Sequence, residues 1–262
     1  MFKWNPEDYH QHSSAQEKWA KELIAKLNLK GDELVLDIGS GDGKVTLEIA
    51  RHLTSGSVLG VDSSIEMIQF SQELIEQQPL KNISFMQADA SLLPFRDDFD
   101  IVFSNAALHW IFDHRPVLKG IYRSLKMNGR ILLQMGGKGN AAKILSLLDV
   151  MMKEEKWKEY FFRFGFSYGF HGCTEYRTWL EEAGLRPTRL ELIPKDMTYP
   201  DRTGLESWIR TTWLPYTGRI PETRREEFIH EIAERYIKKV TPGPDGIIHM
   251  EMMRLEVEAV KP

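Results

Sequence analysis

Short apolar runs alternate with amphipathic stretches along the first half of the chain. Apolar runs are typical of buried strands, and apolar residues at every third or fourth position are typical of helices that cover a sheet. The pattern predicts strands at residues 33–38, 57–61, 83–86, 99–104 and 130–135. It predicts helices at residues 45–53, 64–77 and 113–125, the last one ended by Asn128-Gly129.

This strand–helix alternation with short links predicts the α/β class. The expected fold is a doubly wound, mostly parallel sheet with helices on both faces. Such a sheet binds ligands outside the carboxyl ends of its strands, where the strand order switches. We therefore expect ligand-binding residues at those strand ends.

The second half of the chain is less regular. A helix ending at Gly184 is followed by predicted strands at 189–193 and 249–260, with helices at 205–212 and 223–239 between them. These two helices predict an inserted helical lid between the last strands. We expect one domain over residues 1–262, with a core at about 21–200 and 241–262, a lid at about 201–240 and an N-terminal flap at about 1–20.

Composition narrows the class of protein. The chain has 262 residues, 42% hydrophobic and 27% charged, which is ordinary for a globular protein. A net charge of -4 gives no overall basic field for nucleic acid. The single cysteine, Cys173, cannot form an internal disulfide. Since no apolar leader or membrane-length run is visible, we expect a cytoplasmic protein without a membrane partner.

A glycine-rich turn, D-I-G-S-G-D-G at residues 37–43, follows the first predicted strand and opens the first helix. Glycines allow a sharp turn and let a ligand approach the backbone closely. The third glycine of the dinucleotide-binding pattern would fall on Lys44. A pyrophosphate would be repelled by Asp37, whereas a ligand with an ammonium group would be attracted.

Two further acidic residues follow the next two strands. Asp62 ends the second strand, where a carboxylate can accept hydrogen bonds from ribose hydroxyls, and Asp89 follows the third, where it can accept from an adenine amino group. Each acid alone could equally be a helix-capping residue. Together with Asp37 they suit a ligand with an amine, a ribose and a base but no phosphate, which describes S-adenosylmethionine.

These motifs resemble those of the class I S-adenosylmethionine-dependent methyltransferases, which have a Rossmann-like fold. The likeness covers residues 30–135 and includes the glycine turn, G-V-D-S-S, Q-A-D-A and the run F-D-I-V-F-S-N-A-A-L-H-W. It implies that S-adenosylmethionine is the cofactor. The cofactor-binding residues that it implies are Asp37, Gly39, Gly41, Asp62, Ser63, Met67, Asp89, Ala90 and Asn105.

A narrower resemblance is to the trans-aconitate and juvenile hormone acid methyltransferases, which methylate carboxyl groups. It rests on W-N-P at residues 4–6 with Tyr9, and on N-A, L-H-W and D-H within residues 105–114. It implies a small-molecule acceptor bound by Tyr9, Gln16, His109, Trp110, Arg210, Trp213 and Tyr216. Because Gln16 replaces an arginine of the aconitate enzymes and aromatic residues fill the lid, a bulkier and less charged acid is favoured.

His109 has two interpretations. It can be a catalytic general base, or a structural histidine that packs beside the cofactor, since an ionised carboxylate acceptor needs no base. No metal is expected, because Asp8, His10 and His12 have no standard ligand spacing. The alternatives for the whole chain are an NAD-dependent dehydrogenase, a cofactor-binding regulator, or a nucleic-acid methyltransferase. The sequence N-A-A-L at residues 105–108 favours a small-molecule acceptor over nucleic acid.

Overall fold

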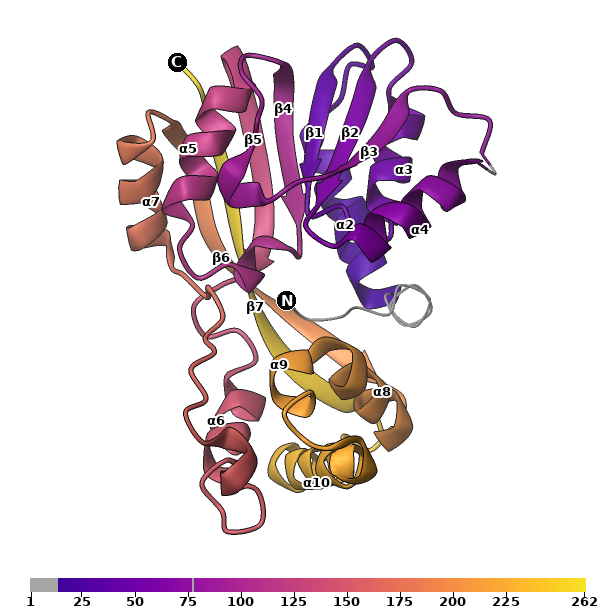
Figure 1. Cartoon of the computed structure of the whole chain (residues 1–262), viewed down its shortest axis with the longest axis vertical. Helices are drawn as coiled ribbons and strands as arrows, with labels where there is room; N and C mark the ends of the chain where they lie inside the picture. The colour runs from indigo at the N-terminus through magenta and orange to yellow at the C-terminus, as the bar shows by residue number, and fades with distance from the viewer. Residues whose placement is uncertain (1–13, 77) are drawn as a thin grey trace. The chain divides into compact units, whose positions relative to one another are not determined.

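The computed structural model describes residues 14–76 and 78–262, and its central feature is a seven-stranded sheet (Figure 1). The strand order is β3-β2-β1-β4-β5-β7-β6. The strands are β1 (Leu34–Ile38), β2 (Ser57–Asp62), β3 (Ile83–Gln87), β4 (Phe99–Asn105), β5 (Leu125–Gly136), β6 (Arg186–Tyr199) and β7 (Ile248–Val260).

Strands β1 to β5 pair in parallel, whereas β7 runs antiparallel to β5. The order reverses at β1, from which β2 and β3 extend to one side and β4 and β5 to the other. The carboxyl ends of β1 and β4 are neighbours at this switch point, which is where a doubly wound sheet binds ligands. The predicted fold class is confirmed.

The helices are α2 (Ser14–Leu27), α3 (Lys44–His52), α4 (Ile65–Glu76), α5 (Arg115–Ser124), α6 (Ala142–Met151), α7 (Cys173–Glu182), α8 (Arg202–Thr212), α9 (Leu214–Thr217) and α10 (Glu222–Val240). Short 3₁₀ turns are η1 (Ala90–Leu92), η2 (Leu108–Trp110) and η3 (Lys158–Phe161). In sequence, α8, α9 and α10 all lie between β6 and β7, as the predicted insertion requires.

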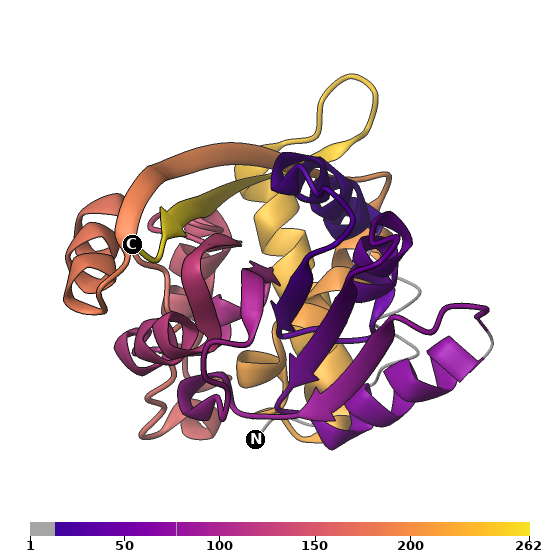
Figure 2. The same ribbon diagram turned by 90° about the horizontal axis from the view of Figure 1, so that it is seen from above.

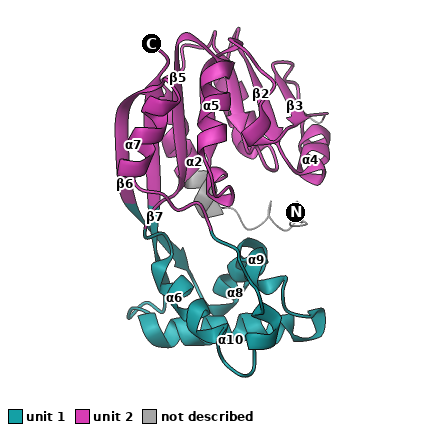
Figure 3. Cartoon of the chain, turned by 60° about the vertical axis from the view of Figure 1, so that its left-hand side comes forward, with its two compact units in different colours: residues 1–2, 139–167, 194–253 teal, residues 3–138, 168–193, 254–262 magenta. Residues whose placement is uncertain are grey.

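The chain divides into two compact units, coloured separately in Figure 3. Within the described residues, we call residues 14–76, 78–138, 168–193 and 254–262 the sheet unit, and residues 139–167 and 194–253 the helical unit. Strands β6 and β7 contribute residues to both units. In the helical unit, α10 packs on α6 and α8, and buries Phe228, Ile229 and Ile232.

The core of the sheet unit lies in two layers, one on each face of the sheet. Successive strand residues point to opposite faces, so the alternate residues Leu36 and Val102 pack with α5 and α7, while Val35 and Ile101 pack with α2, α3 and α4. Figure 2 shows these two sets of helices on either side of the strands. Burial on both faces explains why the strands appear in the sequence as continuous apolar runs.

Several predicted boundaries need correction. The helix predicted over 113–125 ends at Ser124, and β5 begins directly at Leu125, so Asn128-Gly129 lies within a strand rather than at a helix end. Phe99 pairs with Leu125 and Ile101 with Arg130, so the irregularity sits inside the β4–β5 ladder. The prediction that Gly184 ends a helix is confirmed: α7 stops at Glu182 and Gly184 has a φ of 90°.

Three helices had no counterpart in the prediction, namely α2, α6 and the short α9. Helix α2 overlaps the segment expected to be an N-terminal flap, and its buried Trp19, Leu23 and Leu27 share one face. Among the helices of the described residues, none combines the length and the apolar character that crossing a membrane requires.

Candidate cofactor and acceptor site

The glycine turn after β1 has a backbone that other residues would not adopt readily. Gly39 has a φ of 74°, and a Cβ added there would lie 2.1 Å from the Cβ of Ala107. Gly41 has a φ of 54°, and a Cβ there would meet nothing within 4 Å. Gly39 is therefore required for packing against the loop after β4, while the backbone at Gly41 faces open space that a ligand can enter.

Asp37, on β1, is buried at the start of this turn. Its side chain accepts a 2.6 Å hydrogen bond from the Thr46 hydroxyl of α3. Burial and the negative charge of Asp62 raise the pKa of Asp37 to about 7. The hydrogen bond from Thr46 opposes this rise. A carboxylate in this position gains most from a cationic partner, because an ammonium group would stabilise the ionised form.

Asp62, at the end of β2, holds the glycine turn from the other side. One carboxylate oxygen accepts from the Gly41 N–H at 3.0 Å and the other from the Ser64 N–H at 2.9 Å. Burial raises the pKa of Asp62, and these backbone hydrogen bonds oppose the rise. The second acid of the motif thus shapes the loop that carries Gly41 and holds the backbone of Ser64, whose hydroxyl accepts from the Met67 N–H and caps the start of α4.

Asp89 follows β3 and is exposed. Its carboxylate accepts a 2.8 Å hydrogen bond from the Ser91 N–H and caps η1. Asp89 therefore has the capping role that the sequence had left open. Ala90 is the first residue of η1, Met67 is buried on α4, and the Ser63 carbonyl accepts from the Gln87 amide at 3.0 Å. The cofactor roles predicted for these residues remain predictions.

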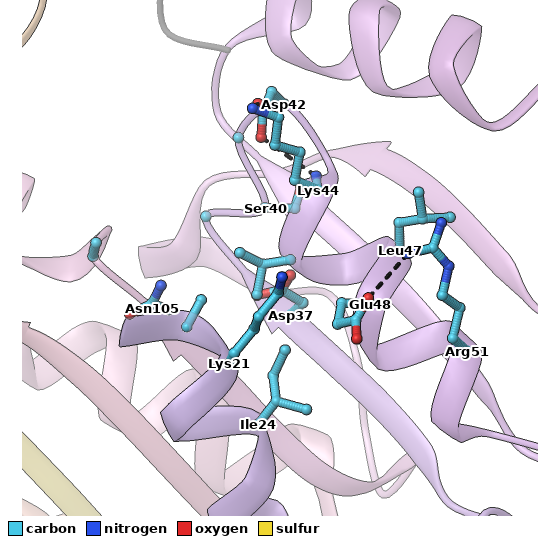
Figure 4. Close-up of a pocket in the computed structure, with 15 residues that line it drawn as sticks. Lys21, Ile24, Asp37, Ser40, Asp42, Lys44, Leu47, Glu48, Arg51 and Asn105 are labelled. Carbon is cyan, nitrogen blue, oxygen red and sulfur yellow. Dashed lines mark hydrogen bonds and ion pairs between the residues drawn. The ribbon is translucent and has the colours of Figure 1, made fainter. Parts of the chain in front are cut away.

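A cavity of about 280 Å³ opens beside the turn (Figure 4). It brings together four of the predicted cofactor residues, namely Asp37, Gly39, Gly41 and Asn105. It is also lined by residues that the sequence analysis did not select: Ala20, Lys21, Ile24, Ser40, Asp42, Lys44, Val45, Leu47, Glu48, Arg51 and Ala106. Asp62, Ser63, Met67, Asp89 and Ala90 are not among its lining residues.

The lining of this cavity fits the amino-acid end of S-adenosylmethionine. The Ser40 hydroxyl is buried, and no other described residue forms a hydrogen bond with it. An uncompensated buried hydroxyl is costly, so a bound polar group is a natural partner for it. With the Asp37 carboxylate and the open side of Gly41, the cavity offers an acceptor for an ammonium group, a hydroxyl and free backbone space.

Helix α2 supplies the wall of the cavity that the sequence analysis missed. Figure 4 shows Lys21 and Ile24 of α2 in the lining together with Asp37 and Asn105. The signal was present in the chain, because Trp19, Leu23 and Leu27 recur at helical spacing before the first strand. An amphipathic helix at this place in the chain packs its apolar face on the sheet, and one of its ends then lies near the switch point of the strand order.

The loop after β4 carries Asn105 and a strained residue. Ala106 has a φ of 55°, unusual for a residue with a Cβ, and its N–H donates to the Gln134 carbonyl of β5 at 2.8 Å. Strained backbone of this kind persists where surrounding structure fixes it, and it is frequent at functional sites. The turn directs the chain from Asn105, in the cavity lining, towards His109.

His109 is buried at the end of this loop. Its Nδ1 accepts a 3.4 Å hydrogen bond from the Gly136 N–H at the end of β5, so the other ring nitrogen carries the proton in the neutral form. Burial, together with the charges of Arg254 and His114, lowers the pKa of His109 to about 3. The ring is therefore neutral near pH 7 and a weak proton acceptor; its predicted catalytic role remains a prediction.

His114 holds the same loop in place through hydrogen bonds. Its Nε2 donates to the carbonyls of Leu108 and Ile111 at 2.8 and 2.9 Å, and its Nδ1 accepts from the Tyr176 hydroxyl of α7 at 2.6 Å. Both carbonyls are acceptors, which sets this tautomer. Burial lowers the pKa of His114 to about 4. In the sequence, His114 stands only within a family motif, and no local pattern predicts its hydrogen bonds to the loop.

The residues predicted to bind the acceptor fall in different parts of the chain. Trp110 belongs to the sheet unit, next to His109. Arg210, Trp213 and Tyr216 belong to the helical unit, where Arg210 pairs with Glu226 at 2.9 and 2.6 Å. Trp213 and Tyr216 are buried there, with ring centroids 5.8 Å apart. Tyr9 and the side chain of Gln16 lie outside the described residues.

Comparison with known proteins identifies the family. Residues 29–184 match the model of a family described as a methyltransferase domain. Because this match spans more than half of the 262 residues, the chain belongs to this methyltransferase family. The cofactor is S-adenosylmethionine, as the motifs predicted, and the alternative of an NAD-dependent dehydrogenase falls away.

Individual relatives span most of the chain. The chain is 32% identical to an uncharacterized methyltransferase of Schizosaccharomyces pombe, over 98% of each sequence. It is 29% identical to a trans-aconitate 2-methyltransferase of Deinococcus radiodurans, over 86% of this chain and 87% of the relative.

A solved structure shares the fold. Phosphoethanolamine N-methyltransferase 2 of Haemonchus contortus, in complex with phosphomonomethylethanolamine and S-adenosylhomocysteine, matches with a TM-score of 0.63 at 20% identity. The match covers 98% of this chain and 57% of that protein.

Proposed function

We propose that this methyltransferase transfers a methyl group to a carboxylate oxygen of a small organic acid. The observation that carries the proposal is the environment of His109, a buried imidazole whose Nδ1 already accepts a hydrogen bond from the Gly136 N–H and whose pKa burial lowers to about 3. Such a ring is poorly suited to remove a proton from an amine or hydroxyl near neutral pH. It suits an acceptor that arrives already ionised. Similarity to a trans-aconitate 2-methyltransferase over most of the chain supports the same acceptor class.

We assign the cofactor-holding roles to the acids and glycines at the strand ends. Asp37 is proposed to receive the ammonium group, the backbone around Gly39 and Gly41 the amino-acid chain, Asp62 the ribose hydroxyls and Asp89 the adenine. When bound, S-adenosylmethionine supplies an electrophilic methyl group, whose transfer to a carboxylate gives an ester and a thioether and releases no proton. We propose that the loop from Asn105 to His109, half-buried at its start and buried at Leu108 and His109, excludes water from this point, which favours a reaction that disperses charge.

The experiment is a transfer assay with isotopically labelled S-adenosylmethionine and a panel of acids, amines and phenols. Mass spectrometry identifies the methylated product, and mild alkaline hydrolysis distinguishes an ester from a methylated amine or ether. We expect labelled methyl esters and one equivalent of S-adenosylhomocysteine. Transfer to amines or phenols alone would contradict the proposal, and absence of any transfer with normal cofactor binding would favour a regulatory role.

A further inference from the structure

Thr46 is a buried hydroxyl in the first turn of α3. It is the third residue of this helix, and none of its surface is exposed. A threonine hydroxyl in a helix commonly bonds back to a carbonyl three or four residues earlier. Thr46 instead donates to Oδ2 of Asp37 on β1, at 2.6 Å. Because a hydroxyl has a single proton, the donor capacity of Thr46 is committed to Asp37.

The contact between Thr46 and Asp37 has the length of a charge-assisted hydrogen bond. Hydroxyls approach ionised carboxylates to about 2.5–2.7 Å, closer than they approach neutral acceptors. Thr46 has little freedom to turn away. Its side chain is branched at Cβ, which leaves few rotamers in a helix, and its neighbours Val45 and Leu47 pack in the core layer on this face of the sheet.

The two carboxylate oxygens of Asp37 have different surroundings. Oδ2 is held by Thr46, whereas no other residue in the described part of the chain donates a hydrogen bond to Oδ1. Asp37 also lines the cavity beside the glycine turn, as Figure 4 shows. The bond to Thr46 thus anchors one oxygen to the protein, and Oδ1 is the oxygen available to a group bound in the cavity.

The charges around Asp37 act on it in both directions. Burial and the charge of Asp62 on β2 favour the protonated acid, while the Thr46 hydrogen bond favours the ionised one. Two ion pairs lie in the cavity lining, between Lys44 and Asp42 at 3.8 Å and between Arg51 and Glu48 at 3.0 Å. The charged residues that line the cavity with Asp37 are Lys21 of α2, and Asp42, Lys44, Glu48 and Arg51 in or beside α3.

We infer that Thr46 is a positioning residue for the cofactor: its hydroxyl orients the Asp37 carboxylate and presents Oδ1 to the ammonium group of S-adenosylmethionine. The inference rests on the role proposed above for Asp37. A carboxylate already fixed by the protein loses little side-chain freedom when the ligand binds, which favours affinity. A molecule whose Asp37 is protonated releases that proton to the solvent on binding, so cofactor binding is linked to pH.

The first test removes the hydroxyl and keeps the branched shape. Thr46→Val should weaken binding of S-adenosylhomocysteine by about 5-fold to 20-fold at pH 7, measured by calorimetry. Thr46→Ser retains the hydroxyl and should stay within about 3-fold of wild type. If the valine variant does not fold, Thr46→Ala takes its place in every comparison. Wild-type affinity in the variant without the hydroxyl overturns the inference.

The second test compares S-adenosylhomocysteine with its desamino analogue, in which a hydrogen atom replaces the amino group. Wild-type protein should bind the analogue much more weakly, since Oδ1 of Asp37 then has no cationic partner. Thr46→Val should weaken binding of this analogue by no more than about 2-fold, because the hydroxyl acts only through the ammonium contact. A purely structural role would weaken both ligands alike, and that result contradicts the inference.

The third test counts protons. Calorimetry at pH 7.5 in two buffers of different ionisation enthalpy gives the number of protons released when S-adenosylhomocysteine binds. The Thr46 hydrogen bond lowers the pKa of Asp37, so the valine variant should hold more protonated Asp37 and release more protons. Its affinity should approach that of wild type at pH 8.5, where Asp37 is ionised in both. Equal proton release and an affinity gap that does not change with pH count against the inference.

A double-mutant cycle and a control complete the design. In an Asp37→Asn background, Thr46→Val should change the affinity for S-adenosylhomocysteine by less than about 2-fold, because the hydroxyl acts through the carboxylate. Ser124→Ala is the control. It removes another buried helix hydroxyl, which donates to the Gly120 carbonyl of α5 at 2.9 Å on the opposite face of the sheet, and should leave cofactor affinity unchanged.

The outcomes separate this inference from the proposed function. If Asp37→Asn binds S-adenosylhomocysteine as tightly as wild type, the role proposed for Asp37 fails and the inference fails with it. If Asp37→Asn weakens binding but Thr46→Val does not, the inference alone fails. Transfer to amines instead of acids refutes carboxylate methylation, whereas the binding and proton measurements still decide the role of Thr46.

Discussion

At the scale of single residues, Asp37 combines a cost in stability with a gain in binding. Its carboxyl has a pKa of about 7 in the folded protein against an ordinary value of 3.8. Between these values the unfolded chain has released the proton while the folded chain retains it. The free energy of unfolding therefore falls as pH rises from about 4 to about 7 through this group.

We expect Asp37→Asn to remove this dependence. The variant should be more stable than wild type at pH 8, by an amount on the order of 2–4 kcal/mol, with little difference at pH 4. Urea unfolding at both pH values measures this. It should also bind S-adenosylmethionine about 10-fold to 100-fold more weakly, because an amide does not replace a carboxylate opposite an ammonium group. Wild-type cofactor affinity should rise with pH through about 7, and equal affinity in the variant would contradict the assigned role.

The two glycines of the turn allow a matched comparison. Alanine at Gly39 collides with Ala107, whereas alanine at Gly41 meets no atom within 4 Å. Both substitutions require a left-handed backbone, which costs about 1–2 kcal/mol. Gly39→Ala should cost a further 1–3 kcal/mol or so from overpacking. Chemical denaturation of the two variants tests the difference, and equal losses of stability would argue against the close contact.

At the scale of elements, the histidine clamp of the loop after β4 predicts acid sensitivity. His114 has a pKa of about 4 in the fold against an ordinary 6.5, so below pH 6.5 the unfolded chain takes up a proton that the folded chain does not. This contribution to stability is complete above about pH 6.5 and is lost as pH falls towards 4. Through His114 the free energy of unfolding rises with pH, whereas through Asp37 it falls. Variants of each residue are therefore needed to separate the two effects.

His114→Gln should lose most of the stability change between pH 7 and pH 4.5 that this group produces, about 3 kcal/mol or less. Tyr176→Phe removes the hydrogen bond to Nδ1 and a weak one to the Met135 sulfur, and should cost about 1 kcal/mol at pH 7. Thermal unfolding across this pH range measures both. A wild-type pH profile in the glutamine variant would show that the titration belongs to another group.

The elements also show how far the sequence analysis could reach. Strands β1 to β4 were predicted within a residue or so, because apolar runs between turn residues are local signals. The start of β5 at Leu125 was missed, since direct passage from helix to strand leaves no turn residue. Helix α6 was missed although Ile144, Leu147, Leu148 and Met151 have helical spacing.

The candidate site could also be predicted only in part. Asp37 and Gly41 could be predicted because one local motif contains them both. Whether Asp62 and Asp89 were caps or ligands could not be decided, since a cap and a ligand have the same residue type at the same place. The structure shows a capping hydrogen bond for Asp89, whereas Asp62 accepts from the Gly41 and Ser64 N–H groups ahead of α4. The meeting of Arg254 with His109 depends on antiparallel pairing between distant strands, which no local spacing encodes.

At the scale of the whole molecule, a buried ionic cluster joins distant parts of the chain. Glu256 on β7 is bound by Lys26 of α2, Gln134 of β5 and Arg189 of β6. Burial alone would raise the pKa of Glu256, but these hydrogen bonds hold it below its ordinary value. Four elements of the sheet unit thus depend on one carboxylate.

Glu256→Gln should therefore lower the free energy of unfolding by about 2 kcal/mol at pH 7, because Lys26 loses its carboxylate partner and Arg189 retains only Glu191 and Glu258. Glu258→Gln, two residues along at a half-exposed position, should cost about 1 kcal/mol or less. Guanidinium chloride denaturation of the two variants provides the measurement. Similar values for both would show that the cluster is no stronger than an ordinary surface pair.

The position of β7 bears on how the protein is made. This strand follows all the others in the sequence, yet it lies inside the sheet, between β5 and β6. On the ribosome, β5 and β6 emerge long before the strand that must separate them. Until β7 is released, the backbone N–H and C=O groups along one edge of β5 are unpaired, and they can pair with β6 or with another nascent chain. Premature termination before residue 248 would fix that open edge permanently, so such fragments should be strong chaperone clients rather than partly active enzymes.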